Sequence, residues 1–286
     1  MVRHANMFFA ILIILLVSGC TASQGGTGGI AIKSFTPDIQ QVFPGEKIRL
    51  QALIENTGSA RARITEMKVL GLDGWNPQAV TSECTRGLEL LPVRSGISGD
   101  TKVCIWEFTA PVVPDRINVD FRPTLRVYYS YSTDLVKNVN ILPRQELVQL
   151  QSQGKPLPID SVSGSVSPVT FSLEAQGPIR LAGSDVTFPV KITATNTGGG
   201  SVCLDDCTLG NQNIDAVSIR LESGMTLQDC QSPIRLSLFK GSNSIQCKLT
   251  ASGLDPGQVS QKQIELHSDY IYFADRETVI TLTGKP

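Results

Sequence analysis

The stretch that decides the fold reads KIRLQALIENTG over residues 47–58 and returns as VTFPVKITATNTG over residues 186–198. In each copy apolar and polar residues alternate, which is the pattern of a β-strand with one face in a core and the other toward water. An Asn-x-Gly sequence ends each copy and supplies residues that tolerate the positive φ of a turn. The sequence therefore predicts a β-rich module that is present twice.

Further landmarks recur downstream in the same order and at nearly the same spacing. The matched landmarks are Cys84 and Cys230, Cys104 and Cys247, Tyr129 and Tyr270, Tyr131 and Tyr272, and Asp134 and Asp275. Each copy holds about seven short strand-like runs over roughly 110–120 residues, the size of an immunoglobulin-like sandwich. We predict an all-β protein with two tandem immunoglobulin-like β-sandwich domains, over residues 30–142 and 168–286. Residues 143–167 are predicted to form a linker with a short helix over 145–153.

The start of each module also matches a known pattern. Pro44-Gly45 in the first copy and Ala182-Gly183 in the second precede the alternating strand and its Asn-Thr-Gly end. This order resembles the start of CARDB-type and related immunoglobulin-like modules of prokaryotic, possibly archaeal, surface proteins. The resemblance covers about 20 residues in each copy and implies the sandwich fold of those modules. It does not account for the paired cysteines.

The first 20 residues have the pattern of an export signal. Arg3 gives a positive n-region, and the apolar run from Met7 to Val17 is too short to cross a bilayer core of about 30 Å. The end of this segment, LVSGC over residues 16–20, resembles the lipobox of lipoprotein signal peptides. The resemblance implies that Cys20 becomes the first mature residue and carries lipid. The alternative interpretation is an uncleaved membrane anchor over residues 1–20.

Residues 21–29 read TASQGGTGG, a composition that predicts a flexible tether between a membrane and the folded body. Both interpretations of the leader predict an exported protein. We expect it to be anchored to the outer face of the cytoplasmic membrane or at the cell surface, with membrane lipid as its partner at the N-terminus.

Charge and histidine content exclude several classes of function. The chain has 25 Lys and Arg against 26 Asp and Glu, so it carries no basic excess for nucleic-acid phosphates. Of its two histidines, His4 lies in the leader and only His267 lies in the body. No nucleophile motif, phosphate-binding loop or metal-ligand spacing accompanies His267. The sequence predicts a protein that is not an enzyme and takes no cofactor.

Seven cysteines are present, and lipid on Cys20 leaves six, an even number that favours disulfides in an exported chain. If equivalent positions of the repeat pair alike, Cys84 bonds Cys104 and Cys230 bonds Cys247. Cys203 and Cys207 then close a small loop. The alternative is a zinc site formed by the four cysteines of the second module, but their spacing is not that of a zinc ribbon.

Four positions stand out as candidate contacts with a partner: Trp75, Tyr128, Asp205 and Asp206. Trp75 lies in a Gly- and Pro-containing loop and is predicted to be exposed, whereas Trp106 is predicted to fill the core. Tyr128 points away from its neighbour Tyr129, because successive side chains of a strand alternate. The four repeated tyrosines, Tyr129, Tyr131, Tyr270 and Tyr272, are predicted to pack inside.

Asp205 and Asp206 lie between Cys203 and Cys207 in an insertion over residues 201–215 that the first module lacks. Their oxygens, with those of Asn211 and Asn213, suit Ca²⁺, but no recognised calcium-loop spacing is present, so a solvated turn is favoured.

Two functional interpretations follow. The first is a non-catalytic cell-envelope protein that binds another envelope protein or a glycan, or serves as a structural module. The second is an accessory or substrate-capturing subunit of a membrane-associated enzyme or transporter complex. We expect the second sandwich to lie further from the membrane than the first, with its insertion as the contact loop.

Overall fold

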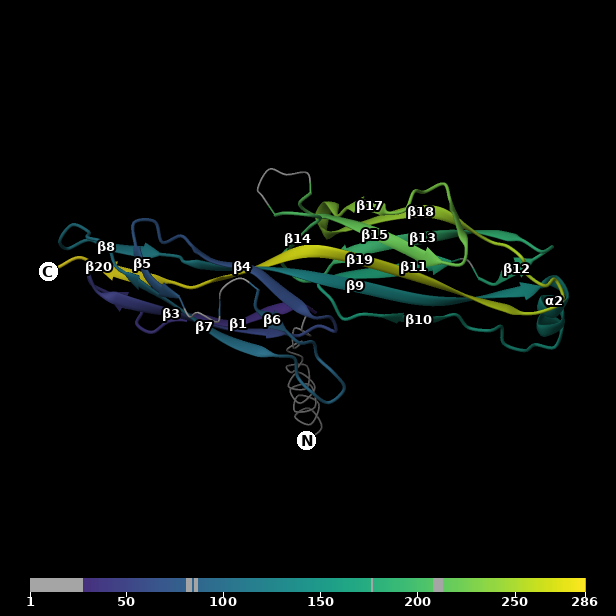
Figure 1. The fold of residues 1–286 in the computed structure, drawn as a ribbon, viewed down its shortest axis with the longest axis horizontal. Coiled ribbons are helices and arrows are strands. Elements are labelled where there is room, and N and C mark those ends of the chain that lie inside the picture. Colours follow the sequence, from purple (N-terminus) through teal and green to yellow (C-terminus); the bar gives the residue numbers. More distant parts are fainter. Residues whose placement is uncertain (1–27, 81–83, 85–86, 176, 208–212, 286) are drawn as a thin grey trace, which may run out of the picture.

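The computed structural model describes residues 28–80, 84, 87–175, 177–207 and 213–285. It confirms the predicted all-β sandwich class: the described elements are strands joined by turns and loops, apart from helix α2 (Arg144–Ser152) and the 3-10 turn η2 (Phe239–Gly241). Figure 1 shows an elongated molecule with one half built mainly from the first repeat and the other mainly from the second. Because two sheets face each other in each half, both halves bury an apolar layer.

The first sandwich has one sheet in the order β1-β3-β7-β5. Its strands are β1 (Ile30–Pro37), β3 (Lys47–Asn56), β7 (Thr101–Thr109) and β5 (Asn76–Val80). In β3, the predicted alternation is visible as a fully buried set at every second position: Ile48, Leu50, Ala52 and Ile54. The other strands of this half are β2 (Gln41–Val42), β4 (Ala62–Leu70), β6 (Glu89–Leu90) and β8 (Asn118–Phe121).

The second sandwich repeats this plan with the sheet β11-β13-β18-β16. Its strands are β11 (Val169–Ala175), β13 (Val186–Asn196), β18 (Ser242–Ala251) and β16 (Thr226–Gln228). The opposite sheet of this half includes β10 (Ser161–Gly164), β12 (Ile179–Leu181), β14 (Ser201–Cys203), β15 (Ala216–Ser223) and β17 (Ile234–Ser237).

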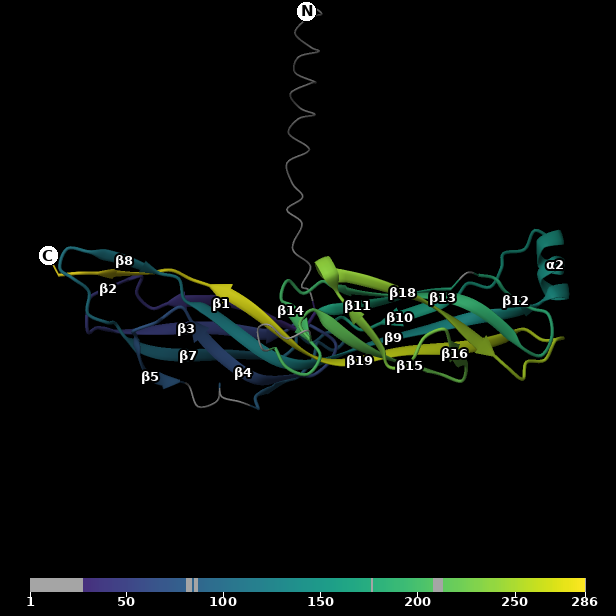
Figure 2. The same cartoon turned by 90° about the horizontal axis from the view of Figure 1, so that it is seen from above.

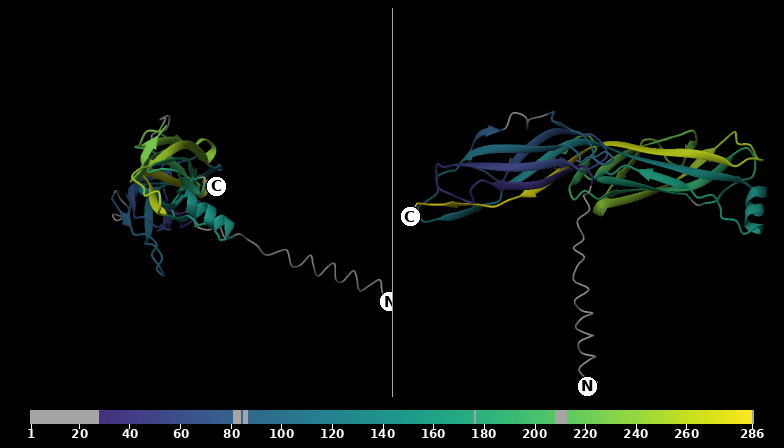
Figure 3. Two further views of the ribbon diagram at one scale, coloured as in Figure 1. Left: turned by 90° about the vertical axis from the view of Figure 1, so that its right-hand side faces the viewer. Right: turned by 90° about the horizontal axis from the view of Figure 1, so that it is seen from below.

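Two long strands, β9 (Thr124–Pro143) and β19 (Ser260–Glu277), run through both halves of the molecule. They pair antiparallel in one unbroken register, from Ser260 opposite Ile141 to Glu277 opposite Thr124. After a short interruption β20 (Ile280–Thr283) and β8 continue the same register, with Ile280 opposite Phe121. We call this combined pairing the ladder. Figure 3 shows its two strands passing from one sandwich into the other.

The ladder exchanges the last strand of each repeat between the sandwiches. The end of β9, at Ile141–Pro143, pairs with β12 in the second sandwich. Conversely β20, the last strand of the second repeat, pairs with β2 in the first sandwich. Figure 1 shows the outcome, because the C-terminal end of the chain lies beside β8, and the end of β9 lies beside α2.

The predicted division into domains therefore needs correction. The sequence placed a boundary at 142/143 and a linker over 143–167, but β9 continues through Pro143, and β10, inside that linker, pairs with Leu135–Asn138. The predicted helix is present as α2 over Arg144–Ser152. The alternation of Val139 and Ile141, or of Ile280 and Leu282, shows only that the strand has a buried face. It does not show which sandwich supplies the other half of that core.

The ladder gives the molecule an approximate two-fold axis at a region that we call the waist. At its centre Ser130 lies opposite Ile271, with Tyr129 opposite Tyr272 and Tyr131 opposite Tyr270. The repeat equates Tyr129 with Tyr270 and Tyr131 with Tyr272, so these cross-strand pairs exchange under the two-fold rotation. In Figure 2 the sandwiches extend in opposite directions from this region.

The four tyrosines are buried at the waist, as the sequence predicted. Tyr131 Oη accepts a hydrogen bond from the amide of Ala60 at 3.1 Å, and Tyr272 Oη accepts one from the amide of Gly200 at 2.8 Å. Both amides belong to the turns that follow the Asn-Thr-Gly sequences. Burial raises the pKa of Tyr272 to about 12, so the phenol stays protonated and donates to Asn196 Oδ1 at 2.7 Å. Each turn is thereby fixed to the ladder.

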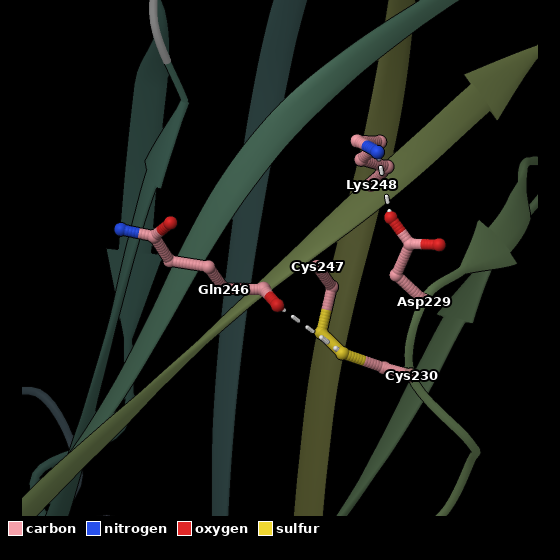
Figure 4. The surroundings of a disulfide bond; sticks show 5 residues. All are labelled: Asp229, Cys230, Gln246, Cys247 and Lys248. Carbon is pink, nitrogen blue, oxygen red and sulfur yellow. Dashed lines mark hydrogen bonds and ion pairs between the residues drawn. A yellow bond between two sulfur atoms is a disulfide. The ribbon is translucent and has the colours of Figure 1, made fainter.

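Three disulfides fasten the remaining loops: Cys84–Cys104, Cys203–Cys207 and Cys230–Cys247. These are the pairs expected from the repeat. Figure 4 shows the third bond, which joins Cys247 of β18 to Cys230. The carboxylate of the neighbouring Asp229 forms an ion pair with Lys248 at 2.7 Å. Disulfides form in oxidising compartments, so their presence places folding outside a reducing cytosol.

The strand exchange predicts that neither repeat folds alone as a monomer. Residues 28–153 lack β20, and residues 156–286 lack the half of β9 that completes their sheet. Expressed together under oxidising conditions, the two fragments should purify as a 1:1 complex with a cooperative melting transition. Expressed separately, each should be unfolded or self-associated. Size-exclusion chromatography with light scattering and circular dichroism measures both. A folded monomer from either fragment alone would contradict the exchange.

Candidate binding surface on the shared sheet

The outward face of the ladder collects polar and aromatic side chains at the waist. Because side chains alternate along a strand, every residue next to a buried tyrosine points outward. We call this surface the ladder face. Its central residues are Arg126, Tyr128, Ser130, Ser132 and Asp134 from β9, and His267, Asp269, Ile271, Phe273 and Asp275 from β19.

An aromatic pair lies on the part of the ladder face that is nearer to the first sandwich. Tyr128 and Phe273 are cross-strand neighbours whose ring centroids lie 5.5 Å apart. The guanidinium of Arg126 lies 4.3 Å from the centroid of Phe273, and the Lys68 amine lies 5.8 Å from that of Tyr128. These distances suit cation–π attraction. Phe273 is only 9% exposed, so the part of the pair that a partner can reach is the half-buried ring of Tyr128 between two cations.

Arg126 is held in place by its cross-strand partner Asp275. Two parallel hydrogen bonds join them, from Nε to Oδ1 at 2.8 Å and from Nη2 to Oδ2 at 2.7 Å. The Asp275 carboxylate raises the pKa of Arg126 above its ordinary value, so the guanidinium stays charged. A bidentate pair fixes the plane of the guanidinium as well as its position.

The equivalent place near the second sandwich holds His267. Its Nδ1 lies 2.5 Å from Asp134 Oδ1 on β9, and its Nε2 lies 3.0 Å from Asp269 Oδ2. Asp269 also accepts a hydrogen bond from Arg220 Nη2 of β15 at 2.8 Å. These four residues form what we call the histidine cluster, beside a shallow depression of about 280 Å³ that Glu222 and Glu265 also line.

The electrostatics of the histidine cluster favour the charged imidazole. Partial burial of His267 lowers its pKa, but the hydrogen bonds with Asp134 and Asp269 outweigh it and raise the pKa above the ordinary value for histidine. For Asp269 burial raises the pKa, and the contacts with His267 and Arg220 outweigh this and lower it. Cation and carboxylate therefore stabilise each other in mildly acidic solution.

The two cation–carboxylate pairs are related by the approximate two-fold axis. Arg126 of β9 pairs with Asp275 of β19, and His267 of β19 pairs with Asp134 of β9. The two repeats thus keep the same pair, with a permanently charged residue in one copy and a titratable one in the other.

The arrangement of His267 does not suit acid–base catalysis. A general base needs one ring nitrogen free to take a proton from a nucleophile or water. Both ring nitrogens of His267 lie within hydrogen-bonding distance of carboxylates instead. The described residues include no group of three or more His, Cys, Asp or Glu side chains placed to hold a metal ion.

The structure brings some of the predicted contact residues together. Tyr128 is half-buried at the centre of the ladder face, and Asp205 and Asp206 are exposed just beyond β14, which pairs with Ile271–Phe273. The insertion that carries both aspartates thus begins beside the ladder face. Asn211, which the sequence analysis considered for calcium, and Cys20 lie outside the described residues.

Trp75 is not an exposed contact residue, which corrects the prediction from its loop. The side chain is only 6% exposed and packs edge-to-face on Phe121 of β8, with centroids 5.3 Å apart. A turn folds it back, as the Trp75 amide bonds the Leu72 carbonyl at 3.1 Å. The Gly-rich sequence indicated a turn but not the direction of the ring. Trp106, 4% exposed, lies in the core as predicted.

Sequence reasoning missed Arg126, Lys68 and Phe273 as neighbours of Tyr128. Arg126 carries a local signal, because it lies two residues before Tyr128 and so on the same face of the strand. Phe273 and Lys68 carry none. Their proximity arises from the pairing of β9 with β19 and with β4.

None of the helices in the described residues is long and apolar enough to cross a membrane.

No family model matches the chain, and no curated protein matches it. Among solved structures, the chain is similar to red sea bream transglutaminase at 12% identity and a TM-score of 0.19. That likeness covers 88% of this chain and 31% of the transglutaminase, so the chain spans less than a third of that protein. A collagen adhesin (CNA) from S. aureus matches at 7% identity and a TM-score of 0.13, over 91% of this chain and 94% of the adhesin.

The histidine cluster predicts a pH-dependent contribution to stability. Because the folded pKa of His267 is raised, its stabilisation is fully present below the unfolded pKa and is lost as the pH rises through the folded pKa. His267→Gln should therefore destabilise the protein more at about pH 5.5 than at about pH 8.5, by a margin below about 1 kcal/mol for this partly exposed group. Urea unfolding of both proteins at the two pH values measures the margin.

The equivalent arginine pair provides the matched control. Asp275→Asn removes the partner of Arg126, whose charge does not change between these pH values. The destabilisation caused by Asp275→Asn should be the same at both. An effect of His267→Gln that is equally independent of pH would show that the imidazole does not titrate in this range.

Proposed function

We propose that the protein is a non-catalytic, membrane-tethered cell-envelope protein that binds a protein partner through the ladder face. The observation that carries the proposal is the accessible ring of Tyr128, which is supported by the buried Phe273 and flanked by Arg126 and Lys68 on the outward face of the sheet. Tyrosine, phenylalanine and arginine are enriched in the centres of protein interfaces. Their rigid ladder support means that little conformational entropy is lost on binding.

The rim of the ladder face also suits an interface. Charged pairs surround the aromatic centre, with Arg126–Asp275 on one side and the histidine cluster on the other. Such rim charges contribute to specificity and to the rate of association more than to affinity. The disulfide-closed loop with Asp205 and Asp206 adds two exposed carboxylates next to this rim.

The proposed tether joins the folded body at the waist, where the ladder face also lies. The described chain begins at the waist, where the Thr57 amide donates to the Gly29 carbonyl at 2.8 Å. An anchor at Cys20 lies at most about 30 Å of extended chain from that point. The sequence led us to expect the second sandwich to be distal from the membrane. The starting point at the waist removes the basis for that expectation, because both sandwiches extend from it.

The first test is photo-crosslinking in intact cells. A benzophenone amino acid at position 128 should yield one discrete cross-linked protein, because the tyrosine lies at the centre of the proposed interface. The same amino acid at position 159 serves as the control, since Ile159 is 89% exposed and lies in the loop between α2 and β10. Equal labelling from both positions, or none from position 128, would move the interface away from the ladder face. The cross-linked partner also tests the second interpretation, since an enzyme or transporter would identify an accessory subunit.

The second test concerns the anchor, which rests on the leader sequence ending in Val17-Ser18-Gly19-Cys20. Intact-mass analysis should find a mature chain that begins at a lipid-bearing Cys20 and partitions into detergent. Cys20→Ser should leave the precursor uncleaved, because lipid transfer to the thiol precedes cleavage in lipoproteins. Wild-type protein that still carries residues 1–19 would instead support the uncleaved anchor.

A further inference from the structure

Two turns at the waist, one in each repeat, expose a large apolar side chain. Ile97 is 66% exposed and lies just before β7, and Phe239 is 76% exposed and lies just before β18. We call these turns, residues 94–97 and 238–241, the apolar tips. A single exposed apolar residue is common on a protein surface, but the apolar tips occupy equivalent places in the two repeats.

The equivalence of the apolar tips follows from the strand register. Thr101, the first residue of β7, pairs with Glu55, and Ser242, the first residue of β18, pairs with Thr195. Glu55 and Thr195 each directly precede the asparagine of an Asn-Thr-Gly turn. The approximate two-fold axis of the ladder therefore relates the apolar tips to each other.

Each apolar tip is closed by backbone hydrogen bonds. In the first, the amides of Arg94 and Ile97 bond each other's carbonyls at 3.1 and 2.9 Å. In the second, the Gly241 amide bonds the Leu238 carbonyl at 2.9 Å, and the Lys240 amine lies 5.6 Å from the centroid of the Phe239 ring. Each tip thus presents an apolar side chain together with a cation.

The described chain begins between the apolar tips. Ile97 and Thr57 line one shallow depression of about 510 Å³, and the Thr57 amide bonds the Gly29 carbonyl at 2.8 Å. On the other side, a Cβ added at Gly241 would lie 3.9 Å from the carbonyl oxygen of Asn196, so the second tip lies beside the second Asn-Thr-Gly turn.

The Asn-Thr-Gly turn of the second repeat also lies next to the start of the described chain. The Thr197 amide bonds the Pro168 carbonyl at 2.8 Å, and a Cβ added at Gly29 would lie 3.1 Å from the Pro168 ring. The two apolar tips therefore flank Gly29, the point that the proposed tether reaches.

Both apolar tips lie on the side of the molecule away from the ladder face. They lead into β7 and β18, which belong to the two sheets that pack against the ladder sheet. The depression beside Ile97 is also lined by Lys33 and Glu55, which form an ion pair at 2.9 Å on the outer surface of the first of these sheets. Figure 2 shows β1 and β11 on one side of the waist and β4 and β15 on the other.

The length of the tether limits what can cover the apolar tips. An anchor at Cys20 lies at most about 30 Å of extended chain from Gly28, so the lipid surface stays within reach of both tips. A tether of this length makes the contact intramolecular, at an effective concentration in the millimolar range. Two side chains then suffice for a contact that a free protein would not maintain.

The side chains at the apolar tips suit a lipid surface. Phenylalanine and isoleucine enter the boundary between headgroups and acyl chains, while lysine and arginine keep their charged ends among the headgroups. Anionic lipids attract such cations in addition. Arg94 and Lys240 are both exposed beside the apolar side chains.

We propose that the two apolar tips rest on the membrane that anchors the chain, with Ile97 and Phe239 inserted at the boundary between headgroups and acyl chains. This inference rests on the proposed tether. The contact places the long axis of the molecule along the membrane and turns the ladder face away from the lipid, toward a partner.

Fluorescence quenching by lipid tests this orientation in the full-length protein. The protein is reconstituted in vesicles of phosphatidylcholine and phosphatidylglycerol, in which part of the phosphatidylcholine carries a doxyl quencher near the head of its acyl chain. A fluorescent amino acid replaces Ile97 or Phe239. The matched controls are Arg63 of β4 and Glu222 of β15, which are exposed on the ladder side.

Quenching at each apolar tip should be at least about threefold stronger than at its control. Interfacial side chains lie about 5–10 Å deep, whereas the control positions are separated from the lipid by the thickness of a sandwich. Vesicle flotation, measured on the same samples, separates this inference from the proposed function. Protein that floats but is quenched equally at all four positions, or at none, would overturn the membrane contact and leave the tether standing.

Two other outcomes would overturn more than the membrane contact. Stronger quenching at positions 63 and 222 would place the ladder face on the lipid and contradict its role toward a partner. Protein that does not float with the vesicles would refute the tether and this inference together.

A second variant tests the two side chains themselves rather than an apolar fluorophore. The fluorescent amino acid is placed at Ser95, in the first tip, and Ile97→Ser and Phe239→Ser are introduced together. Both side chains are exposed, so the fold should persist, which circular dichroism checks. Quenching at position 95 should fall at least about twofold. Unchanged quenching would show that Ile97 and Phe239 do not hold the tips at the lipid.

Discussion

The antiparallel pairing of β9 with β19 is the interaction on which the rest of the structure depends. It runs in a single register through both sandwiches and continues in β8 and β20. Side chains of a strand alternate with a period of two, so a slip by one residue would turn every buried side chain toward water. This constraint acts on both cores at once, since Leu125 and Val139 of the same strand lie in different halves. The sandwiches are thereby coupled into one folding unit.

The same alternation produces the ladder face. With Tyr129 and Tyr131 held inside by hydrogen bonds and packing at the two-fold axis, Tyr128 points outward. The register then places Phe273 beside it and Asp275 beside Arg126. The candidate interface is therefore a consequence of the core, and its side chains are as firmly placed as the strands that carry them.

Departures from the two-fold symmetry mark where the repeats have diverged. The second repeat has His267 where the first has Arg126, and it carries the disulfide-closed insertion beyond Cys203. Neither of these differences changes a buried residue of the ladder. Divergence also reaches buried positions, because Val127 of the first repeat corresponds to Ser268 of the second and both side chains are fully buried.

The sequence by itself determined the fold class, the duplication, the location of most strands, the inward direction of the four tyrosines and the three disulfide pairs. Each follows from a short-range period or from the comparison of two copies within one chain. Only the tertiary structure decided which strands are exchanged, where the Trp75 ring lies, and that Lys68 and Phe273 surround Tyr128. Alternation specifies that a strand has a buried face, but two sandwiches of similar sequence offer that face equivalent partners. The choice between them is made by chain connectivity and long-range packing, which no local pattern records.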